Sequence, residues 1–304
     1  MKLAALDLGS NSFHLLVVET DGNQGLTKIG SDKEVLGLGS VVQEYGRLSD
    51  VAYGRALDVV GRMATIARDL GAVKLLAVGT SALRDARNGA HFCADCSADH
   101  GVHIELLSGD DEARLAYRGA QSALPLTTGR VLVADVGGGS VELAVGEGAN
   151  CESVQSLQLG FLRLAHAFPL KELGGATRLR RYVQLECEKA RWRLGRFDTL
   201  LLSGGTARAI GKLLGGGIAS ASTAQVQALC AALTASSTDA LLARGVERPR
   251  APVLGAGAAV ISGLLAGLGL RELRVSPRGL REGVILRELS RRAARAAQSH
   301  DRVA

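Results

Sequence analysis

The sequence has few of the residues on which several classes of protein depend. Aromatic residues make up 3% of its 304 positions and include one tryptophan, and no basic segment is interleaved with them. The stacking surfaces that bind single-stranded nucleic acid are therefore missing, and nucleic acid is not expected as a partner. The five cysteines are an odd number scattered over the chain. Without an export signal, this pattern argues against a disulfide framework and predicts reduced thiols.

Long hydrophobic runs are also missing. No stretch of 18 or more uninterrupted apolar residues is present, so no membrane span is expected. The N-terminus has neither a charged leader nor a small-residue cleavage site, and we expect a cytoplasmic location. With 47% hydrophobic and 22% charged residues, the chain can bury a proper core and divides most naturally into two domains.

The net charge of +6 suits an acidic partner. Much of the excess positive charge lies near the C-terminus, in a group that we interpret as a solvated helix face. This group consists of Arg287, Arg291, Arg292 and Arg295.

A repeated segment is the most informative feature of the sequence. Residues 3–19 align without gaps to residues 131–147, so that Asp7 matches Asp135 at an offset of 128 positions. Each copy indicates a strand, a tight polar turn and a returning strand. A second pair, 75–81 and 201–207, repeats at nearly the same distance and resembles a buried strand that enters a Gly-Thr turn and a helix. The repeats predict two similar α/β halves facing each other across a cleft.

Between these repeats, apolar periodicity predicts further helices and strands. The connection between the halves is expected between Ser122 and Gly129, around Pro125, which gives domains of residues 1–124 and 125–304. The C-terminal helix, about 286–304, is a candidate to pack back on the first domain. Helices are predicted at 51–70, 89–100, 111–122, 177–194, 223–243, 255–268 and from 280, with strands at 103–107 and 272–275.

The second repeated turn has the composition of a phosphate-binding loop. Gly137, Gly138 and Gly139 let backbone N–H groups crowd around an oxyanion, and Ser140 adds a hydroxyl donor. Asp135 precedes the loop and Glu142 follows it, so both carboxylates can point towards bound phosphates. Such hard oxygen ligands are what Mg²⁺ requires. A glycine-rich turn flanked by solvated acids is the alternative, which the duplication disfavours.

The first repeated turn offers side-chain donors at the corresponding place. Ser10, Asn11 and Ser12 are candidate phosphate ligands, and Asp7 is the counterpart of Asp135. Asn and Ser residues also stabilise ordinary hairpin turns, but the recurrence of this turn favours a binding role.

Two strand-to-helix junctions add further candidates. Gly205 and Thr206 lie at a helix start, where free N–H groups attract anions. An arginine follows each junction, and of the two, Arg84 is the stronger candidate for a phosphate contact and Arg208 the weaker.

Two other segments carry potential chemistry. The acids around Glu112 exceed what a helix cap needs, so one of them could act as a general base. Cys93, Cys96 and His100 could suggest zinc, but their spacing places them on one helical face, where cysteine usually acts as a small core residue.

Five motifs in one order resemble the exopolyphosphatase and guanosine pentaphosphate phosphohydrolase family, which belongs to the actin/hexokinase superfamily of duplicated ribonuclease-H-like domains. The similarity spans nearly the whole chain. These motifs are LDLGSNS at 6–12, TSALRDARNG at 80–89, SGDDEAR at 108–114, DVGGGSVE at 135–142 and LREG at 280–283.

The resemblance implies a fold of two such domains and a magnesium-assisted hydrolase that releases orthophosphate from inorganic polyphosphate by in-line attack of water. It implies that Glu112 is the general base, that Glu142 positions the water or the metal, and that Asp135 is linked to the metal. The chain resembles the short, two-domain members. It departs from the family pattern at Pro277 and Arg278, which replace a stretch that is often acidic in relatives.

Three other functions remain open at this point. Guanosine pentaphosphate, hydrolysed at its 5′ end, is the main alternative substrate. A non-catalytic sensor of polyphosphate or nucleotide could close its two halves on a ligand. A sugar kinase of the same superfamily would need an aspartate base in a sugar pocket, for which no candidate is present. The apolar C-terminal half leaves a homodimer open.

Overall fold

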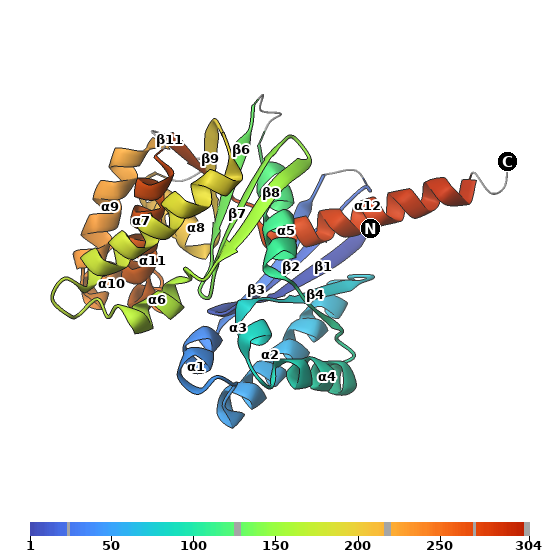
Figure 1. The fold of residues 1–304 in the computed structure, drawn as a ribbon. Helices are drawn as coiled ribbons and strands as arrows, with labels where there is room; N and C mark the ends of the chain where they lie inside the picture. Colours follow the sequence, from blue (N-terminus) through green and yellow to red (C-terminus); the bar gives the residue numbers. More distant parts are fainter. Residues whose placement is uncertain (23–24, 125–128, 216–219, 270–271, 301–304) are drawn as a thin grey trace.

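The chain folds into two α/β halves, each built on a mixed sheet. The structure is a computed structural model and describes residues 1–22, 25–124, 129–215, 220–269 and 272–300. The strand orders are β3-β2-β1-β4-β5 in the first sheet and β10-β11-β9-β6-β7-β8 in the second. If the antiparallel edge strand β10 is left aside, β8-β7-β6-β9-β11 repeats the first order. The predicted fold class, two duplicated α/β domains, is confirmed (Figure 1).

The first half begins with the β1–β2 hairpin and ends with the helix that leads to the second half. Its strands are β1 (Lys2–Leu8), β2 (Ser12–Glu19), β3 (Thr27–Val35), β4 (Leu75–Gly79) and β5 (Ile104–Leu106). Its helices are α1 (Leu38–Tyr45), α2 (Asp50–Asp69), α3 (Ser81–Asp85), α4 (Gly89–His100) and α5 (Gly109–Gln121).

The second half repeats this plan with more helices. Its strands are β6 (Val131–Val136), β7 (Val141–Glu147), β8 (Asn150–Leu157), β9 (Thr199–Ser203), β10 (Ser220–Ser222) and β11 (Glu272–Val275). Its helices are α6 (Phe161–Ala167), α7 (Gly175–Leu194), α8 (Gly205–Leu213), α9 (Thr223–Ala235), α10 (Thr238–Ala243), α11 (Ala251–Leu268) and α12 (Leu280–His300).

The predicted hairpins form in register. Asp7 pairs with His14 across β1 and β2, and Asp135 pairs with Glu142 across β6 and β7. The predicted single helix at 223–243 is wrong, because the chain breaks between α9 and α10, where the Ser237 side chain accepts a hydrogen bond from the Ala240 N–H and starts a new helix. Residues 125–128, on which the expected domain boundary falls, lie outside the described residues.

Each sheet is covered on one face by a helix from the other half of the chain. Helix α5 packs on β6, β7 and β8, where Ala113 and Tyr117 join a buried cluster with Val133 and Leu201. Helix α12 lies along β1 and against α5. On the first sheet, α12 contributes Leu280, Val284, Ile285, Leu286 and Leu289 to a cluster with Leu3, Ala5, Leu16 and Val18. Beyond these residues α12 continues away from the body of the molecule (Figure 1).

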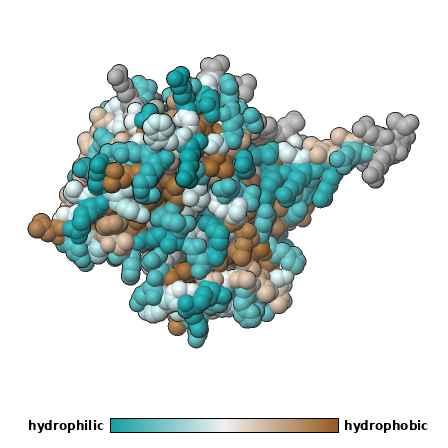
Figure 2. Space-filling view, viewed as in Figure 1, coloured by the Kyte–Doolittle hydropathy of each residue, from teal (hydrophilic) through white to brown (hydrophobic). Residues whose placement is uncertain are grey.

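One described helix, α11, is long and apolar enough to cross a membrane, but 78% of it is buried inside the protein. It lies against α7 and α9, where Gly263 and Gly267 face the backbone of α7. Hydrophobic residues on the face seen in Figure 2 form small groups separated by hydrophilic ones. Because most of α11 is buried against these helices, we describe it as a core helix of the second half.

Candidate active site

Two loops, one from each half, meet at the centre of the molecule. The first loop, residues 9–12, joins β1 to β2, and the second loop, residues 137–140, joins β6 to β7. A Cβ atom on Gly138 would lie 3.3 Å from the backbone nitrogen of Asn11, so the two loops approach within contact distance. The cleft beside them is lined by these predicted residues: Asp7, Ser10, Asn11, Ser12, Glu112, Asp135, Gly137, Gly138, Gly139, Ser140, Glu142, Gly205 and Thr206.

Glycine is required in the second loop because of its neighbours in the first half. A Cβ atom on Gly139 would lie 2.4 Å from the Ser81 hydroxyl and 2.6 Å from the Ser10 hydroxyl. The loop is also linked to the first half by Arg163 of α6. Its Nε donates to the Gly139 carbonyl at 3.1 Å, and its Nη2 pairs with Asp85 of α3 at 2.5 Å. The two loops are therefore held at a fixed separation by contacts between the halves.

Two buried glutamates flank the loops. Glu112, in the first turn of α5, is 7% exposed, and Glu142, on β7, is 2% exposed. Burial raises the pKa of Glu142 to about 7, while the Ser140 hydroxyl opposes this rise. Burial, reinforced by the nearby charge of Glu142, raises the pKa of Glu112 well above its usual value. The Ser156 hydroxyl donates to Glu142 Oε1 at 2.8 Å and fixes its orientation. Carboxyl groups with raised pKa values in a cleft are typical of acid–base sites.

Arg84 lies behind Glu112. Its Nη1 donates to the carbonyl of Leu107 at 2.7 Å and lies 3.3 Å from Glu112 Oε2. It is not among the residues that line the cleft. In this structure Arg84 therefore orients the glutamate, and no contact between Arg84 and the cleft is observed.

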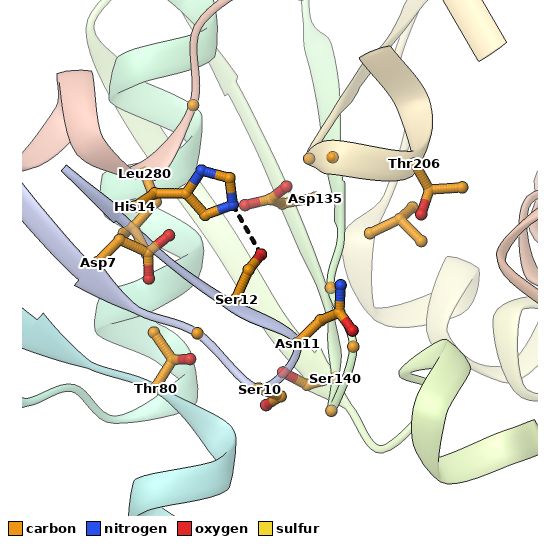
Figure 3. Close-up of a pocket in the computed structure, with 18 of the residues that line it drawn as sticks. Asp7, Ser10, Asn11, Ser12, His14, Thr80, Asp135, Ser140, Thr206 and Leu280 are labelled. Atoms are coloured by element: carbon orange, nitrogen blue, oxygen red, sulfur yellow. Dashed lines mark hydrogen bonds between the residues drawn. The ribbon is translucent and has the colours of Figure 1, made fainter. Parts of the chain in front are cut away.

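Asp7 and Asp135 occupy equivalent positions on the two hairpins (Figure 3). Burial raises the pKa of both carboxyl groups, to about 7 for Asp7, where the charge of Arg281 partly opposes the rise. Asp7 Oδ1 is buried and has no hydrogen-bond partner. A bound cation would satisfy such an oxygen. The described residues hold no group of three or more His, Cys, Asp or Glu side chains arranged for a metal, but Mg²⁺ needs only one or two carboxylates besides water and phosphate. The residues present therefore fit Mg²⁺.

Four charged or titratable residues in the cleft lining were not among the predicted site residues. Three of them had a signal in the sequence: His14 occupies the position of Glu142 in the repeat, and Arg281 and Glu282 lie in the LREG motif. Figure 3 shows His14 joined to Ser12, with a distance of 2.8 Å between Nε2 and the hydroxyl. These four are His14, Arg250, Arg281 and Glu282, and Arg208, the weaker of the two arginine candidates from the sequence, also lines the cleft.

Three arginines enter the cleft from the second half and α12. Arg208 lies on α8, Arg250 immediately before α11, and Arg281 in the first turn of α12. Among the described residues, no carboxylate lies within ion-pair distance of these three guanidinium groups. Arg278, by contrast, donates to the Ser122 carbonyl at 3.1 Å and does not line the cleft. Unpaired guanidinium groups facing one space attract a polyanion.

The cysteine-rich segment lies elsewhere. Cys93, Cys96 and His100 are on α4, as the helical spacing predicted, and Cys96 is fully buried in the core of the first half. The His103 ring lies 2.8 Å from the Ser97 hydroxyl. This segment contributes no residue to the cleft.

Comparisons with known proteins agree with this architecture. Residues 16–292 match the model of the Ppx/GppA phosphatase family. The protein named exopolyphosphatase 1 of Mycobacterium leprae is 30% identical over 96% of this chain and 91% of its own length, and that of Mycobacterium tuberculosis is 31% identical over 96% and 90%. A guanosine-5'-triphosphate,3'-diphosphate pyrophosphatase of Vibrio cholerae is 40% identical over 52% of this chain and 31% of its own length.

Solved structures of the same family share the fold. The Ppx/GppA family member of Aquifex aeolicus has a TM-score of 0.81 at 26% identity and covers 96% of this chain and 98% of its own. An exopolyphosphatase of Cytophaga hutchinsonii has a TM-score of 0.84 at 27% identity and covers 95% and 98%. Both the loops that predicted the family and the match along the chain lead to the same conclusion: this chain belongs to the Ppx/GppA phosphatase family.

Proposed function

We propose that this protein is an exopolyphosphatase, which removes the terminal phosphoryl group of inorganic polyphosphate as orthophosphate. The observation that carries the proposal is the pairing of two loops rich in N–H and hydroxyl donors with two buried glutamates in one cleft. The relatives named exopolyphosphatase, which align over 96% of the chain, support the same substrate. A cytoplasmic location remains a prediction.

In the proposed reaction, donors from both loops hold successive phosphoryl groups. Ser10, Asn11 and Ser12 serve one group, while Ser140 and the backbone N–H groups of residues 137–139 serve the next. Gly205 and Thr206 add the N-terminus of α8. The loops thereby place the terminal phosphorus in line with an attacking water.

Glu112 is the proposed general base, and Glu142 orients the water. The water oxygen forms a bond to the terminal phosphorus, its proton passes to Glu112, and the bridging P–O bond breaks so that the shortened chain leaves with the bridging oxygen. The raised pKa of Glu112 suits a group that must accept a proton in this step. Arg84 restrains the carboxylate through its 3.3 Å contact.

One or two of Asp7, Asp135 and Glu142, the predicted metal ligands, would hold Mg²⁺ or another divalent cation together with water and phosphate oxygens. When bound there, the cation would neutralise charge on the phosphoryl oxygens.

The central test is phosphate release from polyphosphate with and without Mg²⁺. We expect release that needs the cation, and we expect Glu112→Gln to lower kcat by about 10²- to 10⁴-fold while polyphosphate binding is retained. Glu19→Gln, an exposed acid at the end of β2, is the control and should leave kcat unchanged. Polyphosphate binding that is equal in the wild type and the Glu112→Gln protein, without phosphate release by either, would instead support a non-catalytic sensor.

Guanosine pentaphosphate is the second candidate substrate. It is favoured by the 40% identity to the Vibrio cholerae enzyme, although this similarity covers only 31% of that enzyme. Orthophosphate release from the two substrates, measured under identical conditions, distinguishes them. A higher kcat/KM for the nucleotide would overturn the assignment to polyphosphate.

A further inference from the structure

The cleft does not end at the catalytic loops. Past His14 lies a second pocket of about 490 Å³ between the β2–β3 edge of the first half and helix α8 of the second. Both pockets are lined by His14, Gly205, Arg208, Arg250 and Arg281, so they adjoin each other. Six of the residues that line the second pocket are Lys or Arg: Lys28, Lys33, Arg208, Lys212, Arg250 and Arg281.

Strand register explains why the cationic pocket lies on one side of the cleft only. In the first sheet, Asp7, His14 and Lys33 are cross-strand partners on β1, β2 and β3. In the second sheet, the equivalent row is Asp135, Glu142 and Ser156. Cross-strand partners share a face of the sheet. The row of the second half therefore ends at Glu142 and its hydroxyl partner Ser156. The row of the first half instead leads from the carboxylate of Asp7 to the ammonium group of Lys33.

One carboxylate is already placed among these cations. Glu247 Oε2 lies 3.4 Å from Lys33 Nζ, and this contact joins the two halves. The charge of Lys33, followed by that of Arg250, lowers the pKa of Glu247, so this group is an anion at neutral pH. The other acid of the pocket, Asp32, is paired with Arg62. Glu247 thus occupies the position of an anionic ligand.

The contact between Glu247 and Lys33 is suited to displacement. The Glu247 side chain is 58% exposed, and an ion pair at this exposure contributes little to stability. A polyphosphate chain carries several negative charges in a row and can contact Lys33, Arg250 and Lys212 together. Its attraction to the unpaired cations therefore exceeds that of a single carboxylate.

We propose that this pocket is a second anion subsite, which binds the phosphoryl groups that follow the one being cleaved, and that Glu247 is its resident counter-ion, displaced from Lys33 when a long chain enters. The proposal deepens the proposed function and rests on it. It assigns Lys33 and Glu247 to the selection of chain length: Lys33 favours long substrates and Glu247 opposes them.

The test compares kcat/KM for long polyphosphate with kcat/KM for tripolyphosphate in the wild type and three variants. We expect Glu247→Gln to raise the ratio of long to short by about threefold to tenfold and Lys33→Gln to lower it by a similar factor. Glu172→Gln is a matched control, because Glu172 is 59% exposed, pairs with Arg178 at 2.9 Å and changes the net charge equally. This control should leave the ratio within about twofold of the wild type.

Binding measured without hydrolysis separates this proposal from the proposed function. Titration with long polyphosphate in the absence of divalent cation should give tighter binding for Glu247→Gln and weaker binding for Lys33→Gln, even if no turnover is found. If Glu247→Gln and Glu172→Gln changed the affinity for polyphosphate equally, the change would come from net charge alone, and the subsite would be overturned. Unchanged binding and an unchanged ratio in Lys33→Gln would overturn it as well.

Discussion

Asp7, Glu112, Asp135 and Glu142 place four carboxyl groups in one cleft, and burial raises the pKa of each. Folding therefore brings together four carboxyl groups that would repel one another if all of them were ionised. The charges of Arg208 and Arg281 partly offset this repulsion, and a bound cation would offset it further. Protonation of these carboxyl groups would offset the repulsion as well, so the charge of the cleft is expected to depend on pH.

The Asp7 carboxyl group should make the metal-free protein less stable as pH rises. Its pKa is 3.8 in a model peptide and about 7 in the fold, so between these values the folded state binds more protons than the unfolded state. Stability is lost as pH rises through this window. We expect Asp7→Asn to be more stable than the wild type at pH 8 by on the order of 1–3 kcal/mol.

The measurement is chemical denaturation in EDTA at pH 8 and again below pH 4, where the difference should vanish. Asp58→Asn, an exposed substitution on α2, is the control and should change stability little at either pH. Equal or lower stability of Asp7→Asn at pH 8 would contradict the prediction.

Single residues differ in how far the sequence alone could identify them. The repeat placed Asp7 opposite Asp135, and the same alignment places His14 opposite Glu142, so this histidine could have been found. Arg250 could not, because it lies before α11 in a segment without a repeated partner and reaches the cleft only through the packing of the second half.

At the level of elements, the crossing of α5 and α12 depends on two glycines. A Cβ atom on Gly283 would lie 1.9 Å from the Leu115 carbonyl oxygen, and one on Gly119 would lie 1.8 Å from the Gly279 carbonyl oxygen. The two helices therefore touch through their backbones. Glu112 lies in the first turn of α5, so this crossing also supports the position of the proposed base.

Gly283→Ala should separate these helices. Backbone atoms cannot move aside as flexible side chains do, and we expect a loss of about 2–3 kcal/mol or more in the free energy of unfolding. Gly54→Ala is the matched control, because a Cβ atom on Gly54 of α2 meets nothing within 4 Å. This control should gain about 0.5–1 kcal/mol from helix propensity. Thermal and urea denaturation measure both changes, and a neutral Gly283→Ala would refute the close crossing.

The elements that the sequence did not reveal have weak patterns. Strand β3 carries charged and polar residues on both faces and a glycine, since it is the outer strand of its sheet. Its alternation is therefore poor, although it supplies Lys33. Helices α1 and α6 were not predicted either, although they bury Leu38 and Phe161, whereas β11 and α4 have the predicted bounds.

At the level of the whole molecule, the two halves are held together by the exchange of α5 and α12. The hydrophobic pattern predicted both helices, and the C-terminal helix was a candidate to pack on the first domain. The pattern could not show that α5 would pack on the second sheet, because either sheet offers an apolar face. The exchange couples the halves: sheet one receives Val284, Ile285 and Leu289 from the last helix of the chain.

Truncation tests this coupling. A chain that ends after Gly279 lacks the cover of the first sheet, and we expect it to lose cooperative thermal unfolding, since the face with Leu3, Leu16 and Val18 would meet water. A chain that ends after Ala296 loses only the exposed end of α12 and should unfold within a few degrees of the full protein. Circular dichroism melts compare the two, and a cooperative melt of the shorter chain would show that the halves fold independently.

The backbone contact between the two exchanged helices also has a consequence during synthesis. The segment that completes the N-terminal sheet is translated after both sheets, so a nascent chain carries that sheet with one side open until the ribosome has passed residue 289. A chain terminated before this segment would therefore expose one face of the N-terminal sheet and lack Arg281 and Glu282 of the cleft.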